Sequence, residues 1–266
     1  MASPYVRSAR RSEVAPHAPG LPAHRVRRPE AEGGTRLLTR RYEVLSLAAN
    51  GDVETLTRVA PATPIFEDAF AAVARGTLIA TADGPVAVED LLPGTRIDTV
   101  SNGPQPLLWV GAMTVFPDRG DGLSNDTGTL TRVSADSFGI GRPAPDLVLG
   151  PRARILFRSP ACRALIGTSE AFAPARAFVD GDQAVQITPV SPVRVYHLCL
   201  HGQQVIRANG MEIESYHPGP DPEAMMMPDM LEMFLGLFPH VDRLTDFGPI
   251  DIARLTAFEL ERLRAG

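Results

Sequence analysis

The amino-acid sequence predicts a mainly β fold whose few short helices lie near the C-terminal end. Two observations favour this fold class. The 266 residues include 25 Pro and 23 Gly, and this composition favours many short strands and turns over long helices. From residue 72 to residue 109, short β-prone runs alternate with Gly-containing turn pairs. A hydrophobic fraction of 44% is sufficient for a substantial core.

The composition also limits the possible classes of function. The net charge of -5 gives no argument for a nucleic-acid partner. All 26 basic residues are Arg, so chemistry that needs a Lys amine is excluded. Two cysteines, Cys162 and Cys199, are too few for a disulfide framework. No apolar run reaches transmembrane length, and no classical signal peptide is visible, so we expect a cytoplasmic chain or one exported by another route.

The N-terminal 71 residues divide into two parts. Residues 1–36 are rich in Pro, Ala, Gly and Arg and predict a disordered, solvated arm. Residues 37–71 predict a β-hairpin and a linker, with arms at 41–47 and 53–59 and a turn at Asn50-Gly51 or Gly51-Asp52. An apolar segment from 65 to 74 follows and has the length of a short helix.

The next block predicts a series of short antiparallel strands. Leu78–Thr81 is β-prone, Asp83-Gly84 predicts a turn, and Val86 and Val88 alternate on the returning strand. Glu89–Leu92 can form one helical turn, which Pro93-Gly94 ends. Strands are expected again at 95–100 and 107–115, with the Asn102-Gly103 turn between them.

Three later passages complete the pattern. Residues 146–156 read DLVLGPRARIL, residues 193–201 read VRVYHLCLH, and residues 205–219 read VIRANGMEIESYHPG. Together with ARGTLIAT at 74–81, VEDL at 88–91 and NGPQPLLW at 102–109, this order of words resembles bacterial proteins of the Hint fold, the self-processing module of hedgehog C-terminal regions and inteins. The resemblance implies a Hint-like domain at 72–219.

The resemblance also identifies the positions where Hint chemistry takes place. The family's nucleophilic Cys falls on Ala72, and its assisting His, in a phrase like Ser-Pro-x-His-Arg, falls on Ala153. A second His of the family falls on Gln203. Asn209 and His197 complete the candidate catalytic set. Because a methyl group cannot attack a peptide carbonyl, the sequence predicts a catalytically degenerate domain that binds an unknown protein partner or acts as a scaffold. We expect a monomer without a cofactor.

Two alternatives stay open. Residual self-processing by a route without Cys would use Asn209-Gly210 or Asp83-Gly84, although both dipeptides are mainly turn formers. A metal-binding protein would use His197, Cys199 and His201, which alternate along one strand face, with His217 as a fourth ligand. The competing interpretation is that these side chains pack within the fold.

Residues 220–266 predict a helical tail. Pro222 suits a first helical turn, and residues 225–238 are rich in Met and Leu at helical spacing. A second helical run is expected at 251–264, with Ile252, Leu255, Phe258 and Leu263 on its inner side.

Overall fold

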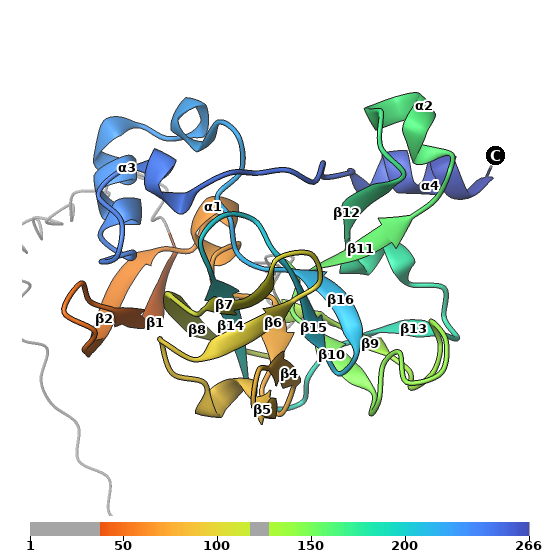
Figure 1. The fold of residues 1–266 in the computed structure, drawn as a ribbon, viewed down its shortest axis with the longest axis horizontal. Helices are drawn as coiled ribbons and strands as arrows, with labels where there is room; N and C mark the ends of the chain where they lie inside the picture. The colour runs from red at the N-terminus through yellow and green to blue at the C-terminus, as the bar shows by residue number, and fades with distance from the viewer. Residues whose placement is uncertain (1–37, 118–127, 266) are drawn as a thin grey trace, which may run out of the picture. The chain divides into compact units, whose positions relative to one another are not determined.

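The computed structural model describes residues 38–117 and 128–265 and confirms a mainly β fold. The disordered arm predicted for residues 1–36 lies outside the described residues. Two antiparallel sheets carry the fold, and the helices are short (Figure 1). No helix in the described ranges has the length and apolar character needed to cross a membrane.

Sheet A contains eight strands in the order β13-β9-β10-β3-β14-β8-β1-β2. The short strand β3 (Val73–Ala74) lies at its centre, between β10 (Leu147–Leu149) and β14 (Val193–Cys199). Its other members are β1 (Thr39–Leu47), β2 (Val53–Pro61), β8 (Trp109–Val115), β9 (Leu130–Val133) and β13 (Ala184–Ile187).

Sheet B follows the order β12-β11-β16-β15-β4-β6-β7, and β5 pairs with β4. Its strands are β4 (Leu78–Thr81), β5 (Gly84–Ala87), β6 (Arg96–Thr99), β7 (Gly103–Pro106), β11 (Arg154–Arg158), β12 (Glu170–Pro174), β15 (Val205–Ala208) and β16 (Met211–Glu214). The first strand of the predicted block is β4, and a 3-10 turn at Val88–Asp90 follows β5, as expected. Strand β7 was not predicted, because it contains two prolines; an edge strand tolerates them.

The predicted hairpin forms as β1 and β2 and joins the main sheet. Strand β1 pairs with β2 on one side and with β8 on the other. The following segment contains one short helix, α1 (Pro64–Glu67). Residues from 37 onward form one unit by their contacts, so the hairpin lies in the same body as the strands of 72–219.

An aromatic core fixes this N-terminal segment. Trp109 on β8 is fully buried, stacks on Phe238 at 4.8 Å between ring centroids, and contacts Phe70 edge-on at 5.2 Å. Its Nε1–H donates a 2.8 Å hydrogen bond to the carbonyl of Leu237. The aromatic cluster therefore combines residues that precede residue 72, that lie within 72–219 and that follow it. Its aromatic members are Tyr42, Phe66, Phe70, Trp109, Tyr216, Phe234, Phe238 and Phe247.

The C-terminal tail is less helical than the sequence predicts. It contains 3-10 turns at Pro222–Met225 and Leu244–Phe247 and the helices α3 (Pro228–Leu235) and α4 (Ala257–Ala265). Two smaller helical segments, α2 (Cys162–Ile166) and a 3-10 turn at Ala175–Phe178, lie earlier in the chain. In Figure 1, α3 lies above β1 and α1, and α4 lies near α2 at the opposite end.

The prediction of a helix at 251–264 was wrong in its first half. Residues 251–256 are not helical; the N–H of Leu255 donates to the carbonyl of Phe172, and the N–H of Phe172 donates to Ala253. This segment therefore borders β12, and the helix begins only after Thr256. The shift in register turns Phe258 outward, with 66% of its surface exposed, and buries Leu260 instead.

Candidate functional site

The peptide bond between Ala71 and Ala72 lies at the centre of sheet A. Both residues are buried, and Val73 directly after them begins β3. The N–H of Ala72 donates a 3.0 Å hydrogen bond to the carbonyl of Tyr196 on β14. The carbonyl of Ala71 accepts a 3.0 Å bond from the N–H of Arg152, and that of Ala72 accepts a 2.8 Å bond from Gly150. The peptide is therefore held by β14 on one side and by residues 150–152 on the other.

The segment after β10 brings position 153 to the same region. Ala153 follows directly on Arg152 and is buried in the apolar cluster that also contains Ala72. Its carbonyl accepts a 2.9 Å hydrogen bond from Ala175. The structure thus brings together the two segments that the sequence comparison identified, and both positions present a methyl group. Neither position can supply a nucleophile or a proton.

Both cysteines of the chain are buried, and the environment of Cys199 keeps its thiol protonated. Cys199 lies on β14 opposite Trp109, is 1% exposed, and its Sγ contacts the carbonyl of Leu200. Burial raises the pKa of the Cys199 thiol well above its ordinary value. Cys162 begins α2 and is also fully buried. Because the thiolate is the reactive form, a buried thiol with a raised pKa is inert.

His197 lies on β14 and contacts the segment that precedes the Ala71–Ala72 peptide. Its Nδ1 donates a 2.7 Å hydrogen bond to the carbonyl of Asp68, and its ring meets Tyr216 edge-on. Complete burial lowers the pKa of His197 to about 4. The imidazole is therefore neutral near pH 7, and its described contact positions the backbone at Asp68.

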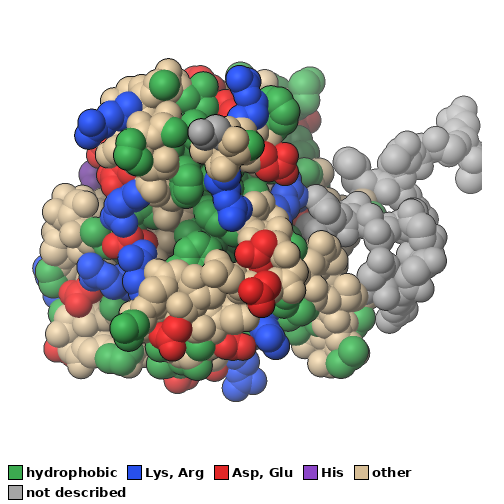
Figure 2. Space-filling view, turned by 90° about the vertical axis from the view of Figure 1, so that its right-hand side faces the viewer, with side chains coloured by type: hydrophobic (Ala, Val, Ile, Leu, Met, Phe, Trp, Pro, Cys, Tyr) green, Lys and Arg blue, Asp and Glu red, His purple; other side chains and the backbone are tan. Residues whose placement is uncertain are grey.

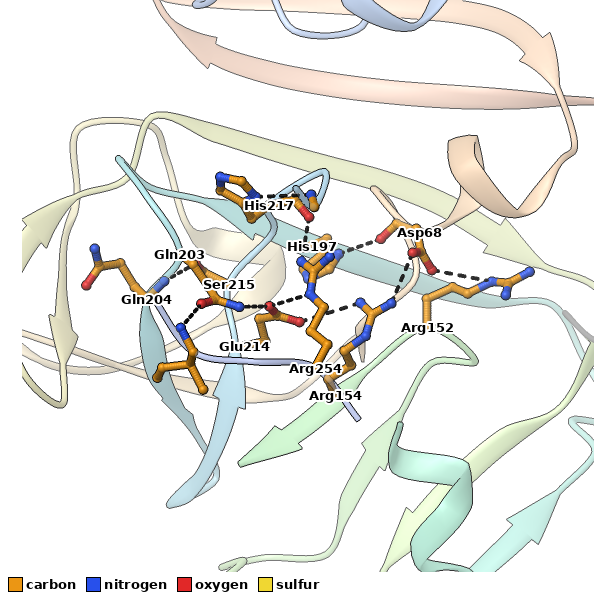
Figure 3. Close-up of polar contacts among 12 residues, drawn as sticks. Asp68, Arg152, Arg154, His197, Gln203, Gln204, Glu214, Ser215, His217 and Arg254 are labelled. Carbon is orange, nitrogen blue, oxygen red and sulfur yellow. Dashed lines mark hydrogen bonds and ion pairs between the residues drawn. The ribbon is translucent and has the colours of Figure 1, made fainter. Parts of the chain in front are cut away.

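A buried ionic network surrounds this position (Figure 3). At its centre is Glu214 on β16, whose side chain is 2% exposed. It pairs with the Nε of Arg254 at 2.8 Å and with Nη1 of Arg154 at 3.5 Å. Arg154 continues to Asp68 at 3.3 Å, and Arg152 lies 3.8 Å from the other oxygen of Asp68. The two carboxylates raise the pKa of Arg154 despite its burial.

Gln203, the third position where the sequence departs from the Hint pattern, belongs to the same network. Its Nε2 donates to Glu214, and its Oε1 accepts a 2.8 Å bond from the N–H of Ile252. Arg254 also donates a 2.6 Å bond to the carbonyl of His217. The network therefore joins the end of α1, β11 and β16 to the C-terminal tail, and through Arg152 it extends to Glu67 and Arg40.

The structure does not bring the four candidate metal ligands together. His201 follows the end of β14 and is exposed, whereas His197 and Cys199 are buried in the strand. Both ring nitrogens of His217 are engaged: Nδ1 accepts from Gly219 and Nε2 donates to Gly248, each at 3.1 Å. Across 38–117 and 128–265, no group of three or more His, Cys, Asp and Glu side chains has the arrangement of a metal site.

Asn209 lies in the turn between β15 and β16, with a φ of +47°. Its Oδ1 accepts a 2.7 Å bond from the N–H of Leu78, and its Nδ2 donates to the carbonyls of Pro145 and Asp146. These contacts tie the turn to β4 and to the segment before β10. An amide fixed by three backbone groups is poorly placed for cyclisation, because its carbonyl carbon must approach the next backbone nitrogen.

Sequence analysis did not find the ionic network. Asp68, Arg154, Glu214 and Arg254 are far apart in the chain, and each is unremarkable in its local pattern. The one available signal was that Arg154 and Glu214 each lie beside apolar residues in a short β-prone run. That signal indicates a possible buried charge but identifies no partner.

Gly150 allows the close contact with the Ala71 carbonyl, and we predict that Gly150→Ala destabilises the fold. A Cβ at this position would lie 2.2 Å from the Ala71 oxygen, which is a backbone atom that cannot move freely. The expected loss in the free energy of unfolding is about 1–3 kcal/mol, measured by denaturant titration. Gly236→Ala is the control: its Cβ would have contacts no shorter than 3.4 Å, and a similar loss there would contradict the argument.

We predict that the free energy of unfolding falls as the pH decreases from about 6.5 to about 4. In this window the unfolded chain binds a proton at His197 and the folded protein does not. Protonation of the unfolded chain therefore costs no stability above pH 6.5 and lowers the unfolding free energy progressively down to about pH 4. One such group contributes about 1.4 kcal/mol per pH unit. His197→Asn, which keeps a donor near Nδ1, should reduce the slope of the unfolding free energy against pH by that amount, and an unchanged slope would contradict the prediction.

We predict that Glu214→Gln destabilises the protein by about 3–5 kcal/mol, because it removes the carboxylate that pairs with Arg254 and leaves Arg154 with Asp68 alone. Glu212→Gln is a matched control on the same strand. Glu212 pairs with the half-exposed Arg158 and Arg142, so its loss should cost less than about 1 kcal/mol. Equal losses in thermal or denaturant unfolding would show that burial of the pair is irrelevant.

Comparison with known proteins agrees with the geometry. Residues 71–220 match the sequence model of the Hint domain. No curated protein matches the chain.

Among solved structures, a bacterial intein-like domain from Clostridium thermocellum is 13% identical, with a TM-score of 0.38 over 55% of this chain and 99% of that one. A splice-inactive variant of the AceL NrdHF class 3 split intein is 9% identical, with a TM-score of 0.38 over 54% and 97%. Because the family match spans more than half of the chain, this protein belongs to the Hint domain family.

Proposed function

We propose that this protein is a Hint domain that has lost self-cleavage and acts as a protein-binding or scaffold module. The observation that carries the proposal is the buried methyl group of Ala72 beside the Ala71 carbonyl, at the position of the family's nucleophile. Ala153 at the position of the assisting His, and two buried cysteines, support it. Acyl transfer requires a thiol or hydroxyl nucleophile, which the side chains of Ala71, Ala72 and Ala153 lack.

The segment before Ala72 also supports retention of the intact chain. Phe66 and Phe70 are fully buried, and the carboxylate of Glu67 pairs with Arg40 at 2.8 Å and with Arg152 at 3.7 Å. Strand β1 joins sheet A through its pairing with β8 and carries the edge strand β2. Residues that a cleaving domain would release are here part of the core and the sheet.

The surface offers an apolar groove suited to a protein partner. It has a volume of about 440 Å³ and lies between α2 and α4. Leu165 and Phe258 are exposed along it, and Glu259 and Arg262 lie at its edge. Figure 2 views this end of the molecule and shows apolar side chains surrounded by charged ones. An apolar patch with a charged rim is typical of interaction surfaces.

We predict that the intact mass of the full chain stays unchanged after long incubation with dithiothreitol. This thiol cleaves a thioester, and Ala72 cannot form one. A cut before residue 72 in the wild type would contradict the proposal. A cut in dithiothreitol at Asn209-Gly210 or Asp83-Gly84, abolished by Asn209→Ala or Asp83→Ala, would instead support residual self-processing; hydroxylamine is unsuitable here because it cleaves Asn-Gly bonds itself.

The matched variants are Ala72→Cys alone and Ala72→Cys with Ala153→His. The double variant restores both family positions, and we expect it to split before residue 72 in a thiol-dependent way and faster than the single variant. Circular dichroism must confirm folding, because a His at buried position 153 overpacks the core by about 1–3 kcal/mol. The 1–71 fragment should co-elute with the remainder in size-exclusion chromatography, since β1, Phe66 and Phe70 hold it in place.

A further inference from the structure

The outer edge of β2 is a long regular strand edge. Strand β2 is the last strand of sheet A, and no described strand pairs with its outer side (Figure 1). It pairs with β1 in continuous register over nine residues, without a bulge, and its first proline is Pro61 at its end. Proteins usually protect such edges with prolines, bulges, short strands or charged side chains. Within the described residues, this edge has no covering strand, no bulge and no proline before Pro61, and its two charges, Glu54 and Arg58, have opposite signs.

The hydrogen bonds of the hairpin determine which backbone groups are available there. The N–H of Ala48 donates to Asp52, and the N–H of Ala62 donates to Leu38. In an antiparallel pair the bonded positions alternate, so the even-numbered residues of β2 bond to β1. The N–H and C=O groups of the odd-numbered residues point to the outer edge; these residues are Val53, Thr55, Thr57 and Val59.

The sequence of this edge is complementary to itself in the antiparallel direction. Residues 53–59 read VETLTRV. A two-fold axis through Leu56 places Val53 opposite Val59, Glu54 opposite Arg58, and Thr55 opposite Thr57. In this register the Val53–Val59 and Thr55–Thr57 pairs are the hydrogen-bonded ones. These are the residues whose N–H and C=O groups point outward from β2. Each charged residue meets an opposite charge, and Leu56 meets its own copy.

We propose that the β2 edge binds a second copy of this chain, forming a symmetric dimer with one continuous sheet across both copies. The charge pattern selects this register. A shift of two residues in one direction places Arg58 opposite Leu56 and Glu54 opposite Ala60. The opposite shift places Glu54 opposite Leu56, and Arg58 then meets only Asp52, which precedes the strand. Val53 and Val59 are 41% and 69% exposed, so pairing them also buries apolar surface. The dimer replaces the monomer expected from the sequence and does not depend on the loss of cleavage.

The first test is sedimentation equilibrium on the full chain between about 1 µM and about 1 mM, because one strand pair corresponds to a weak, micromolar interface. Wild type should dimerise with concentration. Glu54→Arg places two Arg–Arg pairs across the axis and should raise the dissociation constant by about tenfold. The charge swap Glu54→Arg with Arg58→Glu restores both pairs and should restore dimerisation.

The double variant, Glu54→Arg with Arg58→Glu, has the same amino-acid composition and net charge as the wild type, so it controls for effects of the substitutions on the monomer itself. Glu54 and Arg58 lie opposite Ser46 and Tyr42 on β1, which carry no charge near pH 7, so neither variant should unfold the hairpin. Thr57→Pro removes only an outward N–H and should abolish the dimer while the thermal unfolding of the monomer is retained. A wild-type mass that stays monomeric throughout, or a dimer that survives Glu54→Arg and Thr57→Pro, would overturn the proposal.

The second test reads the register directly. Leu56→Cys places two thiols on the two-fold axis in a non-hydrogen-bonded pair, with Cα atoms about 4.5 Å apart, within disulfide range. Mild oxidation should therefore give a covalent dimer. In Val53→Cys the two thiols lie about 20 Å apart and should not crosslink. Both native cysteines are buried, so they do not compete. Equal crosslinking of the two variants would exclude this register.

Discussion

The buried carboxylate of Glu214 is the interaction on which the arrangement of this protein depends. A charge with 2% of its side chain exposed requires partners, and Glu214 obtains them from β11, from the turn after β14 and from the C-terminal tail. Arg154 carries the connection on to Asp68, three residues before Ala71. Removal of the central charge would leave Arg154 on β11 and Arg254 in the tail without their shared carboxylate, and Gln203 without its acceptor. The N-terminal segment, sheet B and the tail therefore hold one another in place.

Local patterns predicted much of the fold, and the misses have clear physical causes. Strand β4 and the β1–β2 hairpin follow from β-prone runs and Gly-containing turns, which are local signals. Strand β7 escaped prediction because Pro104 and Pro106 argue against a strand, and only its edge position makes them acceptable. Residues 251–256 have a helical apolar spacing, but their backbone bonds to Phe172 stabilise an extended form. Such a contact between distant segments is absent from the local sequence.

Part of the candidate site could be predicted from local sequence, and part depends on contacts between distant segments. Ala72 and Ala153 could be located because each lies within a recognisable phrase, and the structure places their segments in contact through Gly150 and Arg152. The ionic network could not be located, because its residues come from α1, β11, β16 and the tail, and no spacing relates them. His197 was identified as a candidate, yet its environment, which lowers its pKa to about 4, depends on burial that the sequence does not reveal.

The burial of the N-terminal segment bears on the proposed loss of self-cleavage. Full burial of an aromatic side chain stabilises a fold by roughly 1.5–3 kcal/mol, and Phe66 and Phe70 are both fully buried. Release of residues before Ala72 would expose these rings, break the pairing of β1 with β8, and leave Arg152 without Glu67. A cut chain would therefore remain one folded body. Under the proposed binding role, cleavage before Ala72 would liberate nothing, and the surfaces of the folded body, among them the outer edge of β2, are those that a partner would contact.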